Sequence, residues 1–222
     1  ELLSKPNGII LITGPTGSGK TTTLYAAINE INPKENKIIT VEDPIEYDLG
    51  GINQCEVKEK AGLTFPKILR SILRQDPNVI VVGEIRDIET AEIAVSTSLT
   101  GHLVLSTLHT NDAPSAITRL TEMGIKPFLI SASVNGILAQ RLVRVMCQSC
   151  KVPQKEIKDS LSDLRLNIKD SEDIEFFHGQ GCNYCNNTGY FGRMGIFEFM
   201  SLTSELREAI HRKVPTNELR KI

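Results

Sequence analysis

The sequence predicts an α/β protein with a mainly parallel sheet, and three observations support this fold class. Short apolar segments that favour β-strands alternate with helical patterns through roughly the first 140 residues. A glycine-rich loop joins the first apolar segment to the first helical pattern. Two pairs of cysteines lie in a more polar stretch further along the chain. We therefore expect a large α/β domain followed by a small region with its own chemistry.

The order of these patterns gives each expected element. Strands are predicted over residues 8–13, 37–42, 78–84 and 102–107, and helices over residues 20–31, 64–74, 89–99, 113–123 and 127–138. Asn-Pro and Asp-Pro pairs, together with a Thr-Gly pair, separate them, as expected for turns. A charged run over residues 151–173 comes later in the chain. It is followed by a strand or hairpin over 190–200 and a helix over 203–211, for which Thr203 or Ser204 is the expected cap.

The glycine-rich loop matches the phosphate-binding pattern G-x-x-x-x-G-K-[ST]. Its glycines allow successive backbone N–H groups to turn inward around phosphates, and the following helix begins at the loop. Lys20 is expected to reach the β- and γ-phosphates, and the Thr21 hydroxyl to bind Mg²⁺. A plain turn is the alternative, but the order strand, loop, helix favours phosphate binding. The expected nucleotide-binding residues are Gly14, Pro15, Thr16, Gly17, Ser18, Gly19, Lys20, Thr21 and Thr22.

Carboxylates follow two of the expected strands, where the ligands of parallel sheets bind. Glu84 follows the apolar run 79–82 and one glycine, and is predicted to be the general base for water or to hold the water that coordinates Mg²⁺. Glu42 ends another strand and is expected to face the γ-phosphate. Asp43 and Glu46 fit either a role in the site or a turn and a surface charge. A solvated strand-end carboxylate is the alternative for Glu84.

Histidines and arginines supply further candidates. His109 follows the strand over 102–107 and could donate to a γ-phosphate, whereas His102 stands at the opposite end of that strand. Hydrolysis also needs a positively charged side chain that contacts the transferred phosphoryl group, and a neighbouring subunit often supplies this side chain. The alternative for every candidate arginine is a surface ion pair. The candidates are Arg70, Arg74, Arg86, Arg141 and Arg144.

Composition limits the remaining possibilities. The 222 residues are 40% hydrophobic, which allows a sizeable core, and no segment approaches the roughly 18 apolar residues of a membrane span. The net charge of −2, the absence of Trp and the 5% aromatic content argue against direct gripping of nucleic acid. The chain begins at Glu1 without Met, so we expect it to be a piece of a longer protein.

Four of the five cysteines form two C-x-x-C pairs with 31 residues between the pairs. Four thiolates suit a closed tetrahedral Zn²⁺ site with a structural role. The spacing exceeds the usual one, but lengthening a flexible loop costs little closure entropy. Two redox pairs or four unrelated thiols are the alternatives. The expected zinc ligands are Cys147, Cys150, Cys182 and Cys185, and Cys55 has no partner in the pattern.

The motifs together resemble those of the type II secretion and type IV pilus assembly ATPases. In that family the segments matching 14–23, 39–46, 79–87 and 101–111 are called the Walker A motif, Asp box, Walker B motif and His box. The resemblance implies a RecA-like ATPase core over 1–144, a tetracysteine zinc subdomain over 145–190 and a C-terminal segment over 191–222 with a strand or hairpin and helices. It implies that Lys20 and Thr21 bind phosphate and Mg²⁺, that Glu84 is catalytic, and that Glu42 and His109 line the site.

The resemblance also implies partners and a location. Such ATPases form hexameric cytoplasmic rings at the inner face of the inner membrane, where ATP hydrolysis moves a platform protein that adds pilin-like subunits to a fibre. The tetracysteine element is similar to that of the secretion or pilus-extension branch. The family's N-terminal region, which supplies arginines to the nucleotide, is not in this chain, so we expect these residues alone to bind nucleotide but hydrolyse it poorly. A nucleic-acid or DNA-uptake motor and a non-hydrolysing scaffold are the alternatives.

Overall fold

The computed structural model describes residues 1–154 and 175–222, so most of the predicted charged run lies outside the described residues. The chain divides into two compact units. The first comprises Glu1–Arg141 and Ile196–Ile222, and the second comprises Leu142–Gly195. Each is described by itself below.

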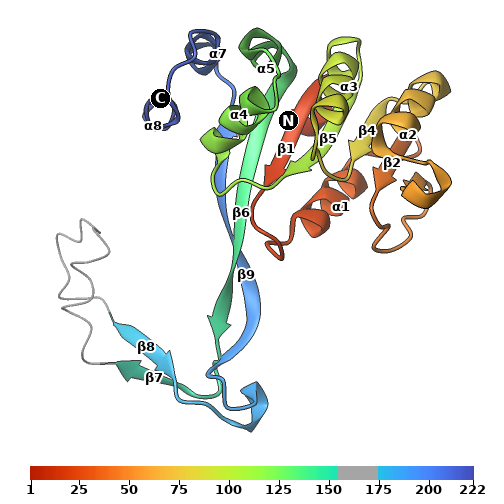
Figure 1. Cartoon of the computed structure of the whole chain (residues 1–222). Coiled ribbons are helices and arrows are strands. Elements are labelled where there is room, and N and C mark those ends of the chain that lie inside the picture. The colour runs from red at the N-terminus through yellow and green to blue at the C-terminus, as the bar shows by residue number, and fades with distance from the viewer. Residues whose placement is uncertain (155–174) are drawn as a thin grey trace. The chain divides into compact units, whose positions relative to one another are not determined.

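The first unit is built on a seven-stranded sheet with the strand order β3-β2-β4-β5-β1-β6-β9 (Figure 1). The pairs β1–β5, β1–β6, β2–β3, β2–β4 and β4–β5 are all parallel, which confirms the predicted mainly parallel sheet. β6 and β9 extend into the residues of the second unit. The strands are β1 (Gly8–Thr13), β2 (Ile38–Glu42), β3 (Asn53–Glu56), β4 (Val79–Val82), β5 (Leu103–Leu108), β6 (Val134–Met146) and β9 (Tyr190–Ser201).

Helices cover both faces of this sheet, because its central strands are apolar on both sides. Ile9 and Leu11 of β1 enter one buried cluster, while the alternate residues Ile10 and Ile12 enter another. The second cluster includes α1, and the first includes the other helices of the unit. The helices of the first unit are α1 (Lys20–Glu30), α2 (Phe65–Ile72), α3 (Ile88–Leu99), α4 (Ala113–Glu122), α5 (Pro127–Ser133), α7 (Ser204–His211) and α8 (Thr216–Leu219). The unit also has 3-10 turns at Leu2–Ser4, Glu59–Ala61 and Leu73–Gln75.

Two sequence expectations differ from the structure. The helix expected over 127–138 ends at Ser133, and its second half is the start of β6. Strand pairing overrides the local helical preference there, because Gly136 pairs with Ile10 of β1. Glycine also suits this position, since a methyl group on Gly136 would lie 2.6 Å from the Leu2 side chain. β3 was not expected, because its polar sequence Asn-Gln-Cys-Glu carries no apolar alternation.

The second unit contains a small antiparallel sheet of β7 (Lys151–Gln154) and β8 (Phe176–Gly179), followed by a 3-10 turn at Asn183–Cys185. Lys151 lies over the Phe177 ring, with the ammonium nitrogen 3.9 Å from the ring centroid. The four predicted zinc ligands border these elements, so the small fold brings them together.

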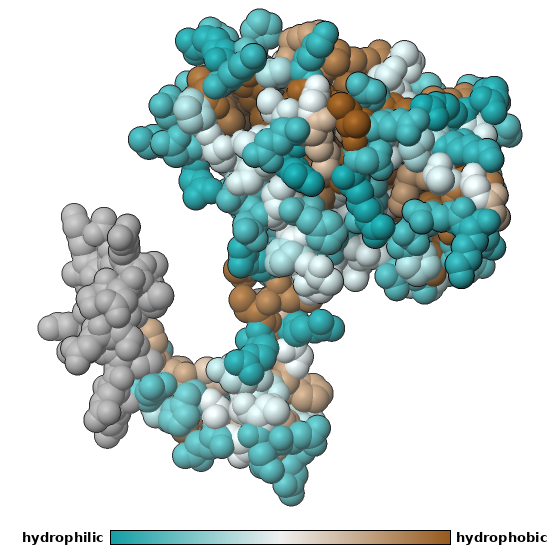
Figure 2. All heavy atoms as spheres, viewed as in Figure 1, coloured by the Kyte–Doolittle hydropathy of each residue, from teal (hydrophilic) through white to brown (hydrophobic). Residues whose placement is uncertain are grey.

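The surface is mostly polar over the visible face of the first unit (Figure 2). Large apolar side chains are nevertheless exposed on β9, where Phe197 is 61% and Phe199 58% exposed. Among the described residues, none of the helices has both the length and the apolar character needed to cross a bilayer.

Candidate active site

The predicted phosphate loop runs from the end of β1 to the start of α1, and its backbone depends on glycine. Gly14, Gly17 and Gly19 have φ angles of 151°, 75° and 86°, a region that residues with side chains rarely adopt. At Gly14 space is short as well, because an added Cβ would lie 2.4 Å from the Gln140 backbone carbonyl. Lys20 Nζ donates to the carbonyls of Gly14 at 2.9 Å and Pro15 at 3.0 Å. The ammonium group therefore lies against the backbone at the start of the loop.

Gln140 of β6 forms a hydrogen bond with this loop, and it was not among the predicted site residues. Its side-chain amide donates to the Ser18 backbone carbonyl at 2.7 Å, and both residues are buried. Gln140 Oε1 and Ser18 Oγ are buried without a hydrogen-bond partner among the described residues. No motif in the sequence indicated this role, because Gln140 lies outside the four segments that carry the family resemblance.

Three neighbouring strands place charged groups beside the loop. β2, β4 and β5 are adjacent and parallel, so their carboxyl ends lie along one edge of the sheet. β2 delivers Asp43, β4 delivers Glu84 and Arg86, and β5 delivers His109. Glu84 Oε1 pairs with Arg86, and Glu84 Oε2 lies 3.4 Å from His109 Nε2. The sheet thus brings together Glu84 and His109, two of the residues that the sequence singled out.

Arg86 links two carboxylates in this group. Arg86 Nη1 lies 3.3 Å from Asp43 Oδ2, while Arg86 Nη2 pairs with Glu84 Oε1. The hydrogen bond with Glu84 is the main reason why the pKa of Arg86 is raised above its ordinary value. Burial lowers the pKa of Lys20, and the Glu84 charge partly opposes that effect. Glu84 and Lys20 therefore act on each other electrostatically.

Glu42 lies in a different environment, since its side chain is buried with a relative exposure of 3%. Its Oε1 accepts hydrogen bonds from Thr40 Oγ1 at 2.5 Å and Gln54 Nε2 at 3.0 Å, and its Oε2 accepts one from the Tyr25 hydroxyl. Tyr25 belongs to α1, the helix that follows the phosphate loop. The Glu42 carboxylate thus accepts three hydrogen bonds from side chains of the first unit.

The loop after β5 is tied to the start of the phosphate loop. The Thr13 hydroxyl accepts from the Thr110 backbone N–H at 2.9 Å, and the two threonine hydroxyls lie 2.7 Å apart. His109 is therefore held beside the loop from both of its chain neighbours, Leu108 and Thr110, because Thr13 Oγ1 also lies 3.1 Å from the Leu108 carbonyl. His102, by contrast, sits at the amino end of β5, where its ring nitrogen Nδ1 lies 3.2 Å from the Thr97 carbonyl.

The other candidate arginines contact groups apart from Glu84. Arg70 pairs with Glu89 at 2.6 Å, and Arg74 donates to the Arg70 carbonyl at 2.9 Å. Arg141 lies 3.4 Å from Asn111 Oδ1, and the Arg144 guanidinium lies 4.0 Å from the centroid of the Tyr190 ring. Of the five arginines, Arg86 is the one that pairs with the predicted general base.

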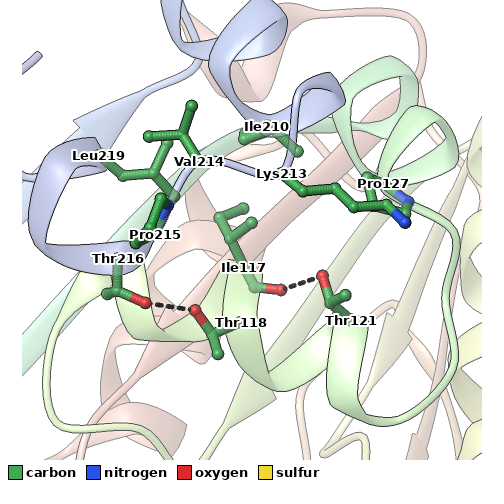
Figure 3. Close-up of a pocket in the computed structure, with 10 residues that line it drawn as sticks. All are labelled: Ile117, Thr118, Thr121, Pro127, Ile210, Lys213, Val214, Pro215, Thr216 and Leu219. Carbon is green, nitrogen blue, oxygen red and sulfur yellow. Dashed lines mark hydrogen bonds between the residues drawn. The ribbon is translucent and has the colours of Figure 1, made fainter.

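A pocket of about 290 Å³ elsewhere in the first unit lies among α4, α5, α7 and α8 (Figure 3). Its wall is apolar apart from Lys213 and three threonines, of which Thr118 and Thr216 have hydroxyl groups 2.6 Å apart. None of the predicted site residues lines it. The residues predicted to bind and hydrolyse the nucleotide therefore lie outside this pocket.

The second unit gathers the four predicted thiols into one cluster. The sulfur atoms of Cys147, Cys150, Cys182 and Cys185 all lie within 4.8 Å of one another. Three of the pairs are separated by 3.8 to 3.9 Å. Zn–S bonds of about 2.3 Å in a tetrahedron require sulfur atoms about 3.8 Å apart, so the donor set fits zinc.

Backbone groups prepare this cluster for a cation. The N–H groups of Cys182 and Gly189 each lie 3.3 Å from the Cys185 sulfur. Burial by itself raises the pKa of Cys185, but these hydrogen bonds help lower it to about 6, whereas burial and the neighbouring thiols raise the pKa of Cys150 to about 12, so Cys185 is favoured as the thiolate over Cys150. Cys55 stands apart on β3, where burial raises the pKa of its thiol.

Comparison with known proteins agrees with this geometry. A crystal structure of the pilus retraction motor PilT with bound ADP superposes with a TM-score of 0.71 at 33% identity, covering 100% of this chain and 54% of PilT. Type II secretion system protein E of Aeromonas hydrophila is 56% identical over 211 residues, which are 95% of this chain and 42% of the relative. The type IV pilus assembly ATPase PilB of Thermus thermophilus is 50% identical over 222 residues, which are 100% of this chain and 25% of PilB.

The chain thus spans less than half the length of these two sequence relatives. The family described as type II/IV secretion system protein matches residues 1–222. This match covers the phosphate loop, the charged group at the sheet edge and the tetracysteine cluster together. The chain is therefore a member of the type II/IV secretion system protein family.

Proposed function

We propose that this chain binds ATP at residues 14–22 and hydrolyses it with Glu84 as the general base. The observation that carries the proposal is the position of Glu84 just beyond the carboxyl end of β4, where its side chain is 15% exposed, lies 3.4 Å from His109 and acts through its charge on the pKa of Lys20 in the phosphate loop. A carboxylate in this position can accept the proton of a water molecule that attacks the terminal phosphate. Lys20 and the loop N–H groups stabilise the charge on the phosphates.

His109 and Glu42 support the site in different ways. His109 lies against Glu84 and is half exposed, so its ring can donate to a γ-phosphate and register its loss. We assign Glu42 a role in positioning and not in direct proton transfer, because its carboxylate accepts hydrogen bonds from Tyr25, Thr40 and Gln54. Through Tyr25 it holds α1, and with it the phosphate loop.

Two metal ions belong to the proposal. The Thr21 hydroxyl would hold Mg²⁺, which neutralises phosphate charge when bound. The four cysteines would hold one Zn²⁺ in a closed site, which stabilises the second unit and leaves no position for a reacting water. The sulfur spacing of 3.8 to 3.9 Å supports this assignment.

Within the longer protein we expect the chain to serve as the ATPase core of a motor. The names of its relatives support a motor of type II secretion or type IV pilus assembly, which would add pilin-like subunits to a fibre. We place it in a hexameric ring in the cytoplasm, at the inner face of the inner membrane, in contact with a platform protein. The tetracysteine cluster favours the secretion or pilus-extension branch.

Substitution of Glu84 by glutamine tests the central assignment. In the longer protein that contains these residues, Glu84→Gln keeps the shape of the side chain but cannot accept a proton, so ATP binding should persist while the hydrolysis rate falls by about 10²- to 10⁴-fold. The matched control is Glu122→Gln, which alters an exposed glutamate on α4 that lies 4.0 Å from Arg119. Hydrolysis at the wild-type rate by Glu84→Gln would remove Glu84 from the reaction.

A further inference from the structure

Gln140 is a buried polar residue of the first unit that none of the expected motifs explains. It lies on β6, which pairs in parallel with β1, and the register sets Ala139 opposite Thr13, so Gln140 lies beside Gly14 at the start of the phosphate loop. The residue is 4% exposed. The two backbones approach closely, because the Gln140 carbonyl oxygen would lie 2.4 Å from a Cβ added at Gly14. Strand pairing therefore fixes the Gln140 backbone against the loop.

The Gln140 side chain reaches a second point of the same loop. Its Nε2 donates to the Ser18 backbone carbonyl at 2.7 Å. Only the NH₂ end of an amide can donate to a carbonyl, so this bond sets which way the Gln140 amide is turned. The amide oxygen Oε1 is then left buried without a hydrogen-bond partner among the described residues. Gln140 thus contacts the loop at Gly14 through its backbone and at Ser18 through its side chain.

The unpartnered oxygen is a cost that an apolar side chain of similar length would avoid. A buried polar atom without a partner destabilises the folded state. Methionine would fill similar space and has no oxygen to satisfy. Sequences break local rules of this kind most often at functional sites. A function of Gln140 therefore has to come from the bond that it does make, with Ser18.

That bond sets the direction of the next N–H group along the chain. The peptide between Ser18 and Gly19 is trans, so its C=O and its N–H point in opposite directions. The Ser18 carbonyl is turned toward Gln140, so the Gly19 N–H points away from Gln140, and within residues 1–154 and 175–222 it donates to no acceptor. Gly19 does not itself restrict this peptide, because glycine adopts its φ of 86° about as readily as a negative φ. The Gln140 bond is therefore a restraint that keeps the peptide from turning over.

We propose that Gln140 is a positioning residue of the nucleotide site, which holds the peptide between Ser18 and Gly19 so that the Gly19 N–H donates to a phosphate. The inference rests on the proposed function, since it adds a residue to the same phosphate site. Gly19 is the N-cap of α1, and N–H groups at the start of a helix bind anions. Without Gln140 the peptide can turn over, and the Ser18 carbonyl oxygen would then face the phosphates and repel them. Gln140 acts through the backbone and does not itself contact the nucleotide.

Nucleotide binding by Gln140→Met tests this role in the full natural polypeptide that contains these residues. Methionine keeps the length of the side chain but cannot donate. The Kd of a fluorescent ATP analogue should rise by about 10- to 100-fold, the range expected when a hydrogen bond to a charged group is lost. The kcat at saturating ATP should change by less than about threefold, because a contact made equally to bound ATP and to the transition state supports binding alone.

Two further variants complete this experiment. Gln140→Glu should bind the analogue at least as weakly as Gln140→Met, since an ionised carboxylate also lacks a donor. The matched control is Gln148→Met, because the Gln148 amide donates to the Met146 backbone carbonyl at 3.2 Å on an exposed residue of the second unit. Its Kd and kcat should match those of the wild type. If Gln148→Met raised the Kd as much as Gln140→Met, the effect would not be specific to the loop and the role of Gln140 would be overturned.

A purely structural role of Gln140 gives a different pattern. If Gln140→Met unfolds part of the protein, the active fraction falls, so kcat drops while the Kd of the remaining folded protein stays at the wild-type value. That pattern, together with a lower midpoint of thermal unfolding, would reassign Gln140 to the core. A wild-type Kd and kcat in Gln140→Met would equally overturn the positioning role.

The failure of the proposed function is distinguishable from these results. A wild-type protein that binds no ATP analogue would refute both the proposed function and the role of Gln140. Hydrolysis at the wild-type rate by Glu84→Gln would remove the general base but leave the Kd test of Gln140 intact. If the wild type binds and hydrolyses ATP while Gln140→Met keeps its affinity, the proposed function stands and the positioning role alone is wrong.

Discussion

The Tyr25 hydroxyl of α1 donates a hydrogen bond to the buried Glu42 carboxylate at the end of β2. This bond joins α1, the helix that follows the phosphate loop, to β2, which β4 and β5 separate from β1 in the sheet. The Tyr25 ring also packs edge-on against Tyr47, with the ring centroids 4.6 Å apart. The phosphate loop is therefore anchored through its helix to groups outside the loop.

This bond predicts a dependence of stability on alkaline pH. Burial raises the pKa of Tyr25, and the adjacent Glu42 raises it further, so the folded state favours the protonated phenol. The stabilisation is complete below the ordinary tyrosine pKa of about 10 and is lost as the pH rises through the raised pKa. Tyr25→Phe should be less stable than the wild type by about 1–3 kcal/mol near pH 7, because Glu42 loses a donor.

Denaturant unfolding between pH 7 and pH 11 measures this difference. The gap between the wild type and Tyr25→Phe should narrow above pH about 10. The control Tyr184→Phe alters a tyrosine that is 60% exposed and should leave the pH profile unchanged. A gap that stays constant with pH would show that Tyr25 stabilises the fold by packing alone.

Gly14→Ala should damage nucleotide binding more than an ordinary loop substitution. The φ angle of 151° is strained for alanine, and the new methyl group would lie 2.4 Å from the Gln140 carbonyl and 2.5 Å from Ser18 Oγ. Because the backbone cannot yield without moving the loop, ATP affinity should fall at least about tenfold, which is about 1.4 kcal/mol.

Titration with a fluorescent ATP analogue measures that affinity. Gly50→Ala is the matched control, since Gly50 has an ordinary φ angle and no atom within 4 Å of an added Cβ. Equal affinity of Gly14→Ala and Gly50→Ala would show that the loop tolerates the methyl group and does not depend on its packing against Gln140.

Much of the fold followed from the sequence because its signals are local. The run before Gly14 is apolar on both faces, and a loop of glycines leads into a helix, so the order of elements around the loop was predictable. The sequence also indicated that Glu84 and His109 each follow a strand at the carboxyl edge of the sheet, and in the structure their side chains lie 3.4 Å apart.

The remainder depended on pairing between distant segments. That Gln140 would bond to Ser18 depends on the register of β6 against β1, and β6 itself was expected to begin as helix. The burial of Glu42 beneath Tyr25, Thr40 and Gln54 required β3, whose polar sequence gave no strand signal. Such contacts join residues across the sheet and leave no periodic trace along the chain.

Cysteine substitution should separate zinc binding from the rest of the chain. The purified protein should contain one zinc ion per chain, and Cys185→Ser should lose most of it, because Cys185 completes the tetrahedral set of thiolates. Loss of the metal should expose residues 142–154 and 175–195 to limited proteolysis. ATP binding by the first unit should change by less than about threefold, since none of its predicted ligands lies in the second unit.

Elemental analysis and protease digestion measure these effects. Cys55→Ser is the control, because Cys55 lies on β3 in the first unit and should leave the zinc content unchanged. A wild-type protein that holds no zinc after growth and purification with zinc present would refute the metal assignment. In that case the thiols would have to be examined as redox pairs.

Thr203 should stabilise the C-terminal helix α7 as its N-cap. Its side-chain oxygen accepts from the Leu206 backbone N–H at 3.2 Å, whereas Ser204 is the first residue within the helix. Leu206, Ala209 and Ile210 bury the apolar face of this helix in the core of the first unit. Thr203→Ala should therefore lower the free energy of unfolding by about 1 kcal/mol, since an N–H at the helix start loses its acceptor. Ser204→Ala should change the free energy by less than about 0.5 kcal/mol in the same denaturant titration, and a larger loss for Ser204→Ala than for Thr203→Ala would assign the cap to Ser204.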